Sequence, residues 1–93
     1  LLMEIDLVKL DSLVMKQAVR DVASKDENLS NQALSYFISD DFKVLCFRNN
    51  IDREIILSSI KELNQYPILS RKKLANDIAK VIDSSFVERV HSR

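Results

Sequence analysis

With 93 residues the chain has room for a single domain, and its 14 basic and 14 acidic residues cancel, which excludes the strongly cationic proteins that coat nucleic acids. It contains no glycine, so the phosphate-cradling loops and nucleophile elbows that need this residue are excluded as well. Because an all-helical chain suffers least from the lack of glycine, we predict an all-α, compact single-domain bundle of about five helices over residues 1–93, without enzymatic activity.

The chain contains one cysteine and one histidine, too few to build a typical Cys/His metal site. Cys46 has no partner for a disulfide, and with His91 near the end of the chain it cannot assemble a zinc site. We therefore expect no metal, no cofactor and no small-molecule substrate, an inert Cys46 in the core, and a reducing, cytoplasmic environment. No run of about 18 uncharged apolar residues is present, so we expect no contact with a membrane.

The first predicted helix begins near the start of the sequence and ends near Ser24. Its start is left open. Either Asp6 or Asp11 could be the N-cap, and residues 3–7 would also suit a short extended segment. Helical spacing predicts that the inward face of this helix consists of Met3, Leu7, Val8, Leu10, Val14, Met15, Ala18, Val19 and Val22.

A polar break over residues 24–31 separates this helix from a short second one. The inward residues of the second helix are predicted to be Ala33, Leu34, Phe37 and Ile38. The acidic pairs at 26–27 and 40–41 are assigned to helix capping, and Asp40 or Asp41 is expected to cap the third helix. The inward residues of the third helix are predicted to be Phe42, Leu45 and Cys46.

Asp52 is placed to cap a fourth helix, because an acidic side chain favours the positive end of a helix dipole. The buried face of this helix is predicted to contain Ile56, Ser59, Ile60 and Leu63. Pro67 disfavours a helical conformation at Tyr66 and so ends the fourth helix, and Ser70 is expected to cap the fifth. The fifth helix is predicted to continue through residues 83–85, with an inward face of Leu74, Ala75, Ile78, Ala79, Ile82, Phe86 and Val90.

Residues 42–61 have the spacing of a short apolar helix, a polar turn and a longer apolar helix. The small residue Cys46 allows two helices to cross closely, and Asn50 stands where such a turn needs a left-handed residue. Ile51 follows as a buried turn residue, Ile56 lies where the second helix packs back, and Leu45 supports the first. In these respects the segment resembles the helix-turn-helix family. The positions that depart from the apolar pattern of that family are Asn49 and Ser59.

The resemblance implies that the helix after the turn enters a groove of duplex DNA. Arg53 and Lys61 would then meet guanine edges or phosphates. Ser58 would meet a phosphate, and Leu57 a thymine methyl group. Glu54 lies among these outward residues and would repel phosphate, so an ordinary helical corner with a solvated outer face remains the alternative.

Basic residues also open the fifth helix, where Arg71, Lys72 and Lys73 are spaced to follow a phosphate backbone. Asp77 lies four residues after Lys73, so the alternative is a solvated face with intrahelical ion pairs. The charge is divided along the chain. Residues 1–47 carry five Lys or Arg against eight Asp or Glu, a net of −3, and residues 48–93 carry nine against six, a net of +3. A polyanion would therefore meet the C-terminal half.

A second resemblance covers residues 33–56, ALSYFISDDFKVLCFRNNIDREII. This segment is similar to small uncharacterised helical proteins of bacterial and prophage-like gene sets. The matching residues are Ala33, Tyr36, Ser39, Asp41, Phe42, Cys46, Ile51 and Asp52. The resemblance implies a cytoplasmic bacterial protein on a mobile element, without an assigned reaction.

Two functions are compatible with these features. The turn at Asn50 and the division of charge favour a small DNA-associated regulatory protein, dimeric, that binds duplex DNA through the corner and the basic fifth helix. Val44 and Phe47 fall off the inward face of the third helix, which is therefore either buried nearly all round or exposes an apolar patch. The alternative function is a protein-interaction module or inhibitor, without nucleic acid, that docks a protein partner or a second copy through an apolar surface including Val44, Phe47 and Val87.

Overall fold

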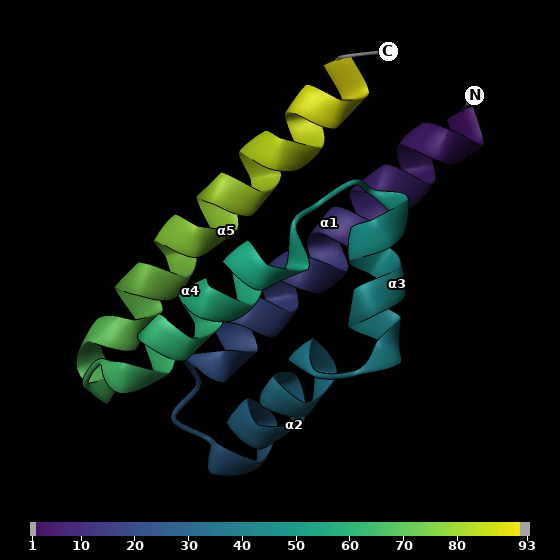
Figure 1. Ribbon diagram of the computed structural model, residues 1–93. Coiled ribbons are helices and arrows are strands. Elements are labelled where there is room, and N and C mark those ends of the chain that lie inside the picture. The colour runs from purple at the N-terminus through teal and green to yellow at the C-terminus, as the bar shows by residue number, and fades with distance from the viewer. Residues whose placement is uncertain (1, 92–93) are drawn as a thin grey trace.

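The computed structural model describes residues 2–91 of the chain, and the side chains of residues 7–86. Within that range the backbone forms five α-helices and no strand, which confirms the predicted all-α bundle (Figure 1). The helices are α1 (Leu2–Val22), α2 (Glu27–Phe37), α3 (Asp40–Arg48), α4 (Arg53–Gln65) and α5 (Ile68–His91).

The two longest helices, α1 and α5, lie side by side in opposite directions, so the start of α1 and the end of α5 lie at the same end of the molecule (Figure 1). α2 packs against α1, α4 packs against α5, and α3 links α2 to α4. One salt bridge, of 3.0 Å between Lys16 Nζ and Asp83 Oδ1, joins α1 to α5 at the surface. Because exposed ion pairs contribute about 1 kcal/mol or less, the pairing of these helices depends mainly on their buried contacts.

Side-chain caps set the starts of α2 and α3. The Asp26 carboxylate accepts hydrogen bonds from two backbone N–H groups of the first turn of α2, which confirms its capping role and starts this helix earlier than the polar break predicted. α3 is capped by Ser39, whose hydroxyl accepts from a backbone N–H three residues later. The predicted caps at Asp40 or Asp41 are therefore wrong, although both carboxylates lie in the first turn, where they favour the positive end of the helix dipole.

The later connections are short and follow most of the predicted signals. Asn50 has φ of 56°, the expected left-handed conformation, and Asp52 caps α4. Pro67 lies between α4 and α5, and its carbonyl already accepts helical hydrogen bonds from the residues three and four positions later. α5 therefore begins at Ile68, and the prediction that Ser70 caps this helix is wrong.

A single core takes side chains from every helix. Three aromatic rings of α2 and α3, those of Tyr36, Phe37 and Phe42, pack edge to face with centroids 4.9 to 5.6 Å apart. The predicted inward residues of α3 and the apolar ones of α4 are confirmed, whereas Ser59 is only half-buried. Ile38 is 81% exposed because α2 ends before it, so its predicted burial is wrong. The buried apolar residues are Met15, Val19, Val22, Ala23, Ala33, Phe37, Phe42, Leu45, Cys46, Ile56, Ile60, Leu63, Ala75, Ala79, Ile82 and Phe86.

The predicted inward face of α1 combines the buried face of the helix with an exposed apolar stripe beside it. Met15, Val19 and Val22 are fully buried, whereas Leu7, Leu10 and Val14 are about half exposed. Periodicity did not separate the two sets because α1 is apolar on both sides. The helix is continuous from Leu2, so the extended alternative and the caps at Asp6 and Asp11 are also wrong. The side chains of Met3, Val87, Val90 and His91, named in the predictions, lie outside the described residues.

Candidate functional site

The corner between α3 and α4 has a left-handed residue at Asn50 and a buried Ile56, two of the features in which the segment resembles a helix-turn-helix. The Ile51 N–H donates to the Cys46 carbonyl at 2.9 Å, closing the turn around the left-handed Asn50. Ile51 is half-buried against the core, and Ile56 of α4 is buried. That this corner is a helix-turn-helix, and that it binds DNA, both stay predictions.

Asn49, which departs from the helix-turn-helix pattern, has a structural partner in α1. Its Nδ2 donates to Asp11 Oδ2 at 2.7 Å and to the Leu45 carbonyl at 2.9 Å. Arg48 donates to the same carboxylate through Nε at 2.8 Å and Nη2 at 2.6 Å. We call Asp11, Arg48 and Asn49 the Asp11 cluster, and it ties the middle of α1 to the carboxyl end of α3.

The Asp11 carboxylate is almost completely buried, at 3% exposure. Burial alone would raise the pKa of Asp11, but hydrogen bonds from Arg48 and Asn49 and the positive charge of Arg48 outweigh it, so the pKa lies below its ordinary value. The sequence does not predict this cluster. Its only signal was an aspartate within the apolar pattern of a helix, since a buried carboxylate requires partners. An ion held in this way supports the fold and is not available for proton transfer to a substrate.

The outer face of α4 presents fewer groups to a nucleic acid than the sequence predicts. Ser58 and Lys61 are exposed, as expected. Arg53 is half-buried, with its Nη2 3.5 Å from Glu54 Oε1. Leu57 is half-buried against the core and does not stand on the outer face. Of the residues predicted to read DNA on this helix, the structure therefore brings only Ser58 and Lys61 fully to the surface.

At the start of α5, the structure separates the three predicted phosphate-binding residues. The Arg71 guanidinium donates to the Tyr66 carbonyl at 2.7 Å and to the Asn64 carbonyl at 3.0 Å, so it binds the carboxyl end of α4. Lys72 and Lys73 are exposed. Two of the three cations thus remain open to an anion.

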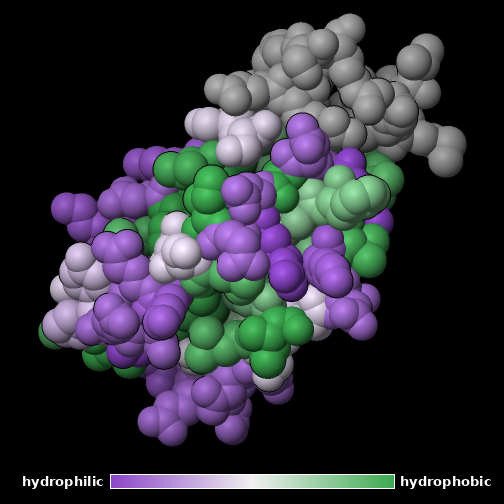
Figure 2. Space-filling model, viewed as in Figure 1, coloured by the Kyte–Doolittle hydropathy of each residue, from purple (hydrophilic) through white to green (hydrophobic). Residues whose placement is uncertain are grey.

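The outer surface of α3 exposes two apolar side chains among charged ones. Phe47 is 88% exposed and Val44 is 55% exposed, which decides between the two alternatives in favour of an exposed patch. Figure 2 shows apolar surface interspersed with polar surface on the side of the molecule that α3 and α4 form. Val87, the third predicted partner residue, lies outside the described side chains. We call Val44 and Phe47 the α3 patch.

Reactive or metal-binding groups do not converge in the described part of the chain. No group of three or more His, Cys, Asp or Glu residues there could hold a metal ion. Burial raises the pKa of the Cys46 thiol to about 11 and that of the Tyr36 phenol to about 12. Both groups therefore stay protonated near neutral pH. Among the described residues, no helix has the length and apolar character needed to cross a membrane.

Comparison with protein-family models, with curated proteins and with solved structures finds no match to this chain.

Proposed function

We propose that this chain is a non-enzymatic protein-interaction module that docks another protein, or a second copy of itself, through the α3 patch. The observation that carries the proposal is the 88% exposure of Phe47. Complete burial of a phenylalanine side chain is worth about 1.5–3 kcal/mol, and in the isolated chain Phe47 contributes almost none of it. Exposed aromatic residues of this kind are frequent anchors of protein interfaces.

The charges favour this function over nucleic-acid binding. A tight DNA-binding protein makes about six to ten phosphate contacts. On α4 and the start of α5, Lys61, Lys72 and Lys73 are the exposed cations, because Arg53 is half-buried beside Glu54 and Arg71 binds the end of α4. The predicted nucleic-acid surface therefore has fewer exposed cations than the sequence indicated, whereas both residues of the α3 patch are exposed.

The variant Phe47→Ser tests the α3 patch. A matched control is Val81→Ser, which removes another exposed apolar side chain, 63% exposed, from α5. Wild type, Phe47→Ser and Val81→Ser are compared by light scattering over a range of concentrations and by affinity capture from a bacterial lysate. We expect self-association, or a retained protein, to disappear with Phe47→Ser alone. If all three proteins behave alike in both measurements, the proposal is wrong.

A second candidate function is binding of duplex DNA, and the left-handed turn at Asn50 with exposed Ser58 and Lys61 on the following helix favours it. Fluorescence anisotropy with a short labelled duplex tests this function. With about three phosphates neutralised by the exposed cations Lys61, Lys72 and Lys73, affinity would fall roughly 40-fold between about 50 and about 200 mM salt. Lys61→Glu would weaken binding further. If micromolar protein does not bind the duplex at low salt, this function is excluded.

A further inference from the structure

The outer face of α1 is apolar and uncovered. Leu7, Leu10 and Val14, spaced by three and four residues, are 45%, 57% and 42% exposed, and Leu13 beside them is 59% exposed. A neighbouring face of the same helix supplies the fully buried core residues Met15, Val19 and Val22. The exposed charged residues Lys9 and Arg20 lie on the same helix, so this apolar stripe is bounded by charge. The spacing of the outer residues matches that of a seam against another helix.

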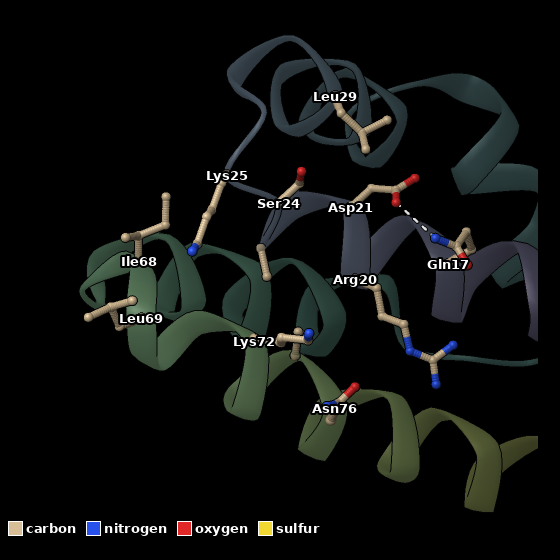
Figure 3. Close-up of a pocket in the computed structure, with 12 residues that line it drawn as sticks. Gln17, Arg20, Asp21, Ser24, Lys25, Leu29, Ile68, Leu69, Lys72 and Asn76 are labelled. Carbon is tan, nitrogen blue, oxygen red and sulfur yellow. Dashed lines mark hydrogen bonds between the residues drawn. The ribbon is translucent and has the colours of Figure 1, made fainter.

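Two adjoining hollows border this face of α1. The first, with a volume of about 500 Å³, lies between the carboxyl end of α1, the start of α2 and the start of α5 (Figure 3). The second, of about 540 Å³, lies between α1 and α2 and is lined by Leu13 and Val14 from the exposed face. Gln17, Arg20, Asp21 and Leu29 line both hollows. We call the two hollows together the α1 groove.

The first hollow combines apolar walls with positive charge. Its apolar side chains include Leu29, Ile68 and Leu69, and the last of these is 82% exposed. Its cations are Arg20 of α1, Lys25 of the turn after α1, and Lys72 of α5 (Figure 3).

No described carboxylate forms an ion pair with these cations. None of the three side chains forms a hydrogen bond or an ion pair in the described part of the chain. Asp21 is the single carboxylate among the described residues that line the groove, and it accepts a hydrogen bond of 2.8 Å from Gln17. The amino end of α5, the positive end of its dipole, adds to the positive potential. An occupant therefore has to supply negative charge and apolar side chains together.

We propose that the α1 groove binds an acidic amphipathic helix of a partner protein. The apolar residues of that helix, three and four positions apart, cover Leu10, Leu13 and Val14, and its carboxylates lie against Arg20, Lys25 and Lys72. The groove lies on α1, α2 and α5, whereas the α3 patch lies on α3, so the two surfaces are independent.

Two other occupants fit the groove less well. A second copy that used its own α1 would bring Arg20 and Lys9 next to the same residues of the first copy, because both lie on the exposed part of that helix. A nucleic acid would satisfy the three cations with phosphates but would leave Leu29, Ile68 and Leu69 without apolar contacts.

Designed peptides test the charge and the apolar character of the occupant separately. The full chain is titrated with an amphipathic helical peptide of Leu, Ala and Glu, with the same peptide carrying Lys in place of Glu, and with a short DNA duplex. We expect the Leu/Glu peptide to bind at least about tenfold more tightly than the Leu/Lys peptide, with less difference at high salt. Amide NMR shifts on binding are expected to concentrate at residues 10–29 and 68–76.

Variants locate the site. Lys72→Glu and Leu69→Ser are each expected to weaken binding of the Leu/Glu peptide about tenfold. Lys73→Glu is the matched control, because Lys73 is exposed on the same helix but does not line the hollow, and it is expected to change affinity by no more than about twofold. Unchanged circular dichroism and unfolding midpoints show that the variants fold.

The proposal is overturned if the two peptides bind equally, if neither binds, if Lys72→Glu has no larger effect than Lys73→Glu, or if the duplex displaces the Leu/Glu peptide from these residues. Phe47→Ser is expected to leave peptide binding unchanged, so a failure of the α1 groove is distinguishable from a failure of the α3 patch.

Discussion

At the scale of single residues, the two charged members of the Asp11 cluster differ in exposure: the negative charge is buried and the positive charge is partly in solvent. The Arg48 side chain is 45% exposed, whereas that of Asp11 is 4% exposed. Removal of the arginine leaves a buried carboxylate with fewer partners, and removal of the carboxylate leaves a cation that solvent can reach. We therefore predict that Arg48→Met lowers the free energy of unfolding by roughly 3 kcal/mol and Asp11→Asn by roughly 1–2 kcal/mol, measured by urea unfolding at neutral pH. Equal losses would contradict this account.

The lowered pKa of Asp11 also predicts a dependence on pH. Because the folded state binds the proton of this carboxyl less readily than the unfolded state, the cluster stabilises fully above the ordinary pKa of 3.8. This stabilisation is lost as the pH falls from about 4 through the lower pKa of the folded state. The unfolding free energy of the wild type should therefore fall more steeply below about pH 4 than that of Asp11→Asn. Parallel acid titrations, followed by circular dichroism in urea, measure the difference.

Cys46 is predicted to be unreactive while the chain is folded. Its side chain is 2% exposed and its pKa is about 11, so the thiolate that reacts with disulfide reagents is roughly one part in a thousand at pH 8. Reaction with an aromatic disulfide should be slow in buffer and fast in denaturing urea. A fast reaction of the folded protein would contradict the burial of this residue.

At the scale of the elements, the turn between α3 and α4 depends on the conformation of Asn50. A residue without the local hydrogen-bonding capacity of asparagine costs about 1–2 kcal/mol in the left-handed region, whereas glycine has no such penalty. With φ of 56° at this position, Asn50→Ala should lower the unfolding free energy by about 1 kcal/mol and Asn50→Gly by much less. Thermal unfolding of the two variants under identical conditions checks the order. If alanine is tolerated as well as glycine, the turn relaxes to a different conformation.

Capping, turn and proline residues predicted where the helices begin and end better than periodicity predicted which faces of the helices are buried. Asp52, Asn50 and Pro67 act within a few residues of their own positions, and each marks the boundary expected from the sequence. The inward face of α1 depends on which neighbours cover it, and a helix with apolar residues on both sides does not contain that information.

The candidate sites show the same limit. Exposure of Phe47 was one of two alternatives, and only the packing of α3 against the core decides between them. Arg71 of α5 donates to two carbonyls at the end of α4, and Arg20 of α1 lines the same hollow as Lys72 of α5. Both arrangements bring together residues of different elements. Periodicity along one helix carries no sign of either arrangement.

At the scale of the whole molecule, one core serves all five described helices, so a loss in the core should affect them together. Phe42 is completely buried and Phe47, on the same helix, is 88% exposed. We predict that Phe42→Ala lowers the unfolding free energy by about 3–5 kcal/mol and that Phe47→Ala changes it by less than about 0.5 kcal/mol. Circular dichroism and tyrosine fluorescence should report a single transition for each variant. Separate transitions would show that the helices do not share one core.

The position of Asp11 in the middle of α1 constrains how that helix can lie lengthwise in the bundle. A slide by one turn, about 5.4 Å, would bring Leu7 or Met15 to the donors of Arg48 and Asn49 and would carry the carboxylate into an apolar environment. Apolar side chains on both sides of α1 tolerate such a slide, and a buried ion does not. The Asp11 cluster therefore favours one axial position of α1 over positions shifted by a turn in either direction, because only that position gives the buried carboxylate its hydrogen-bond donors.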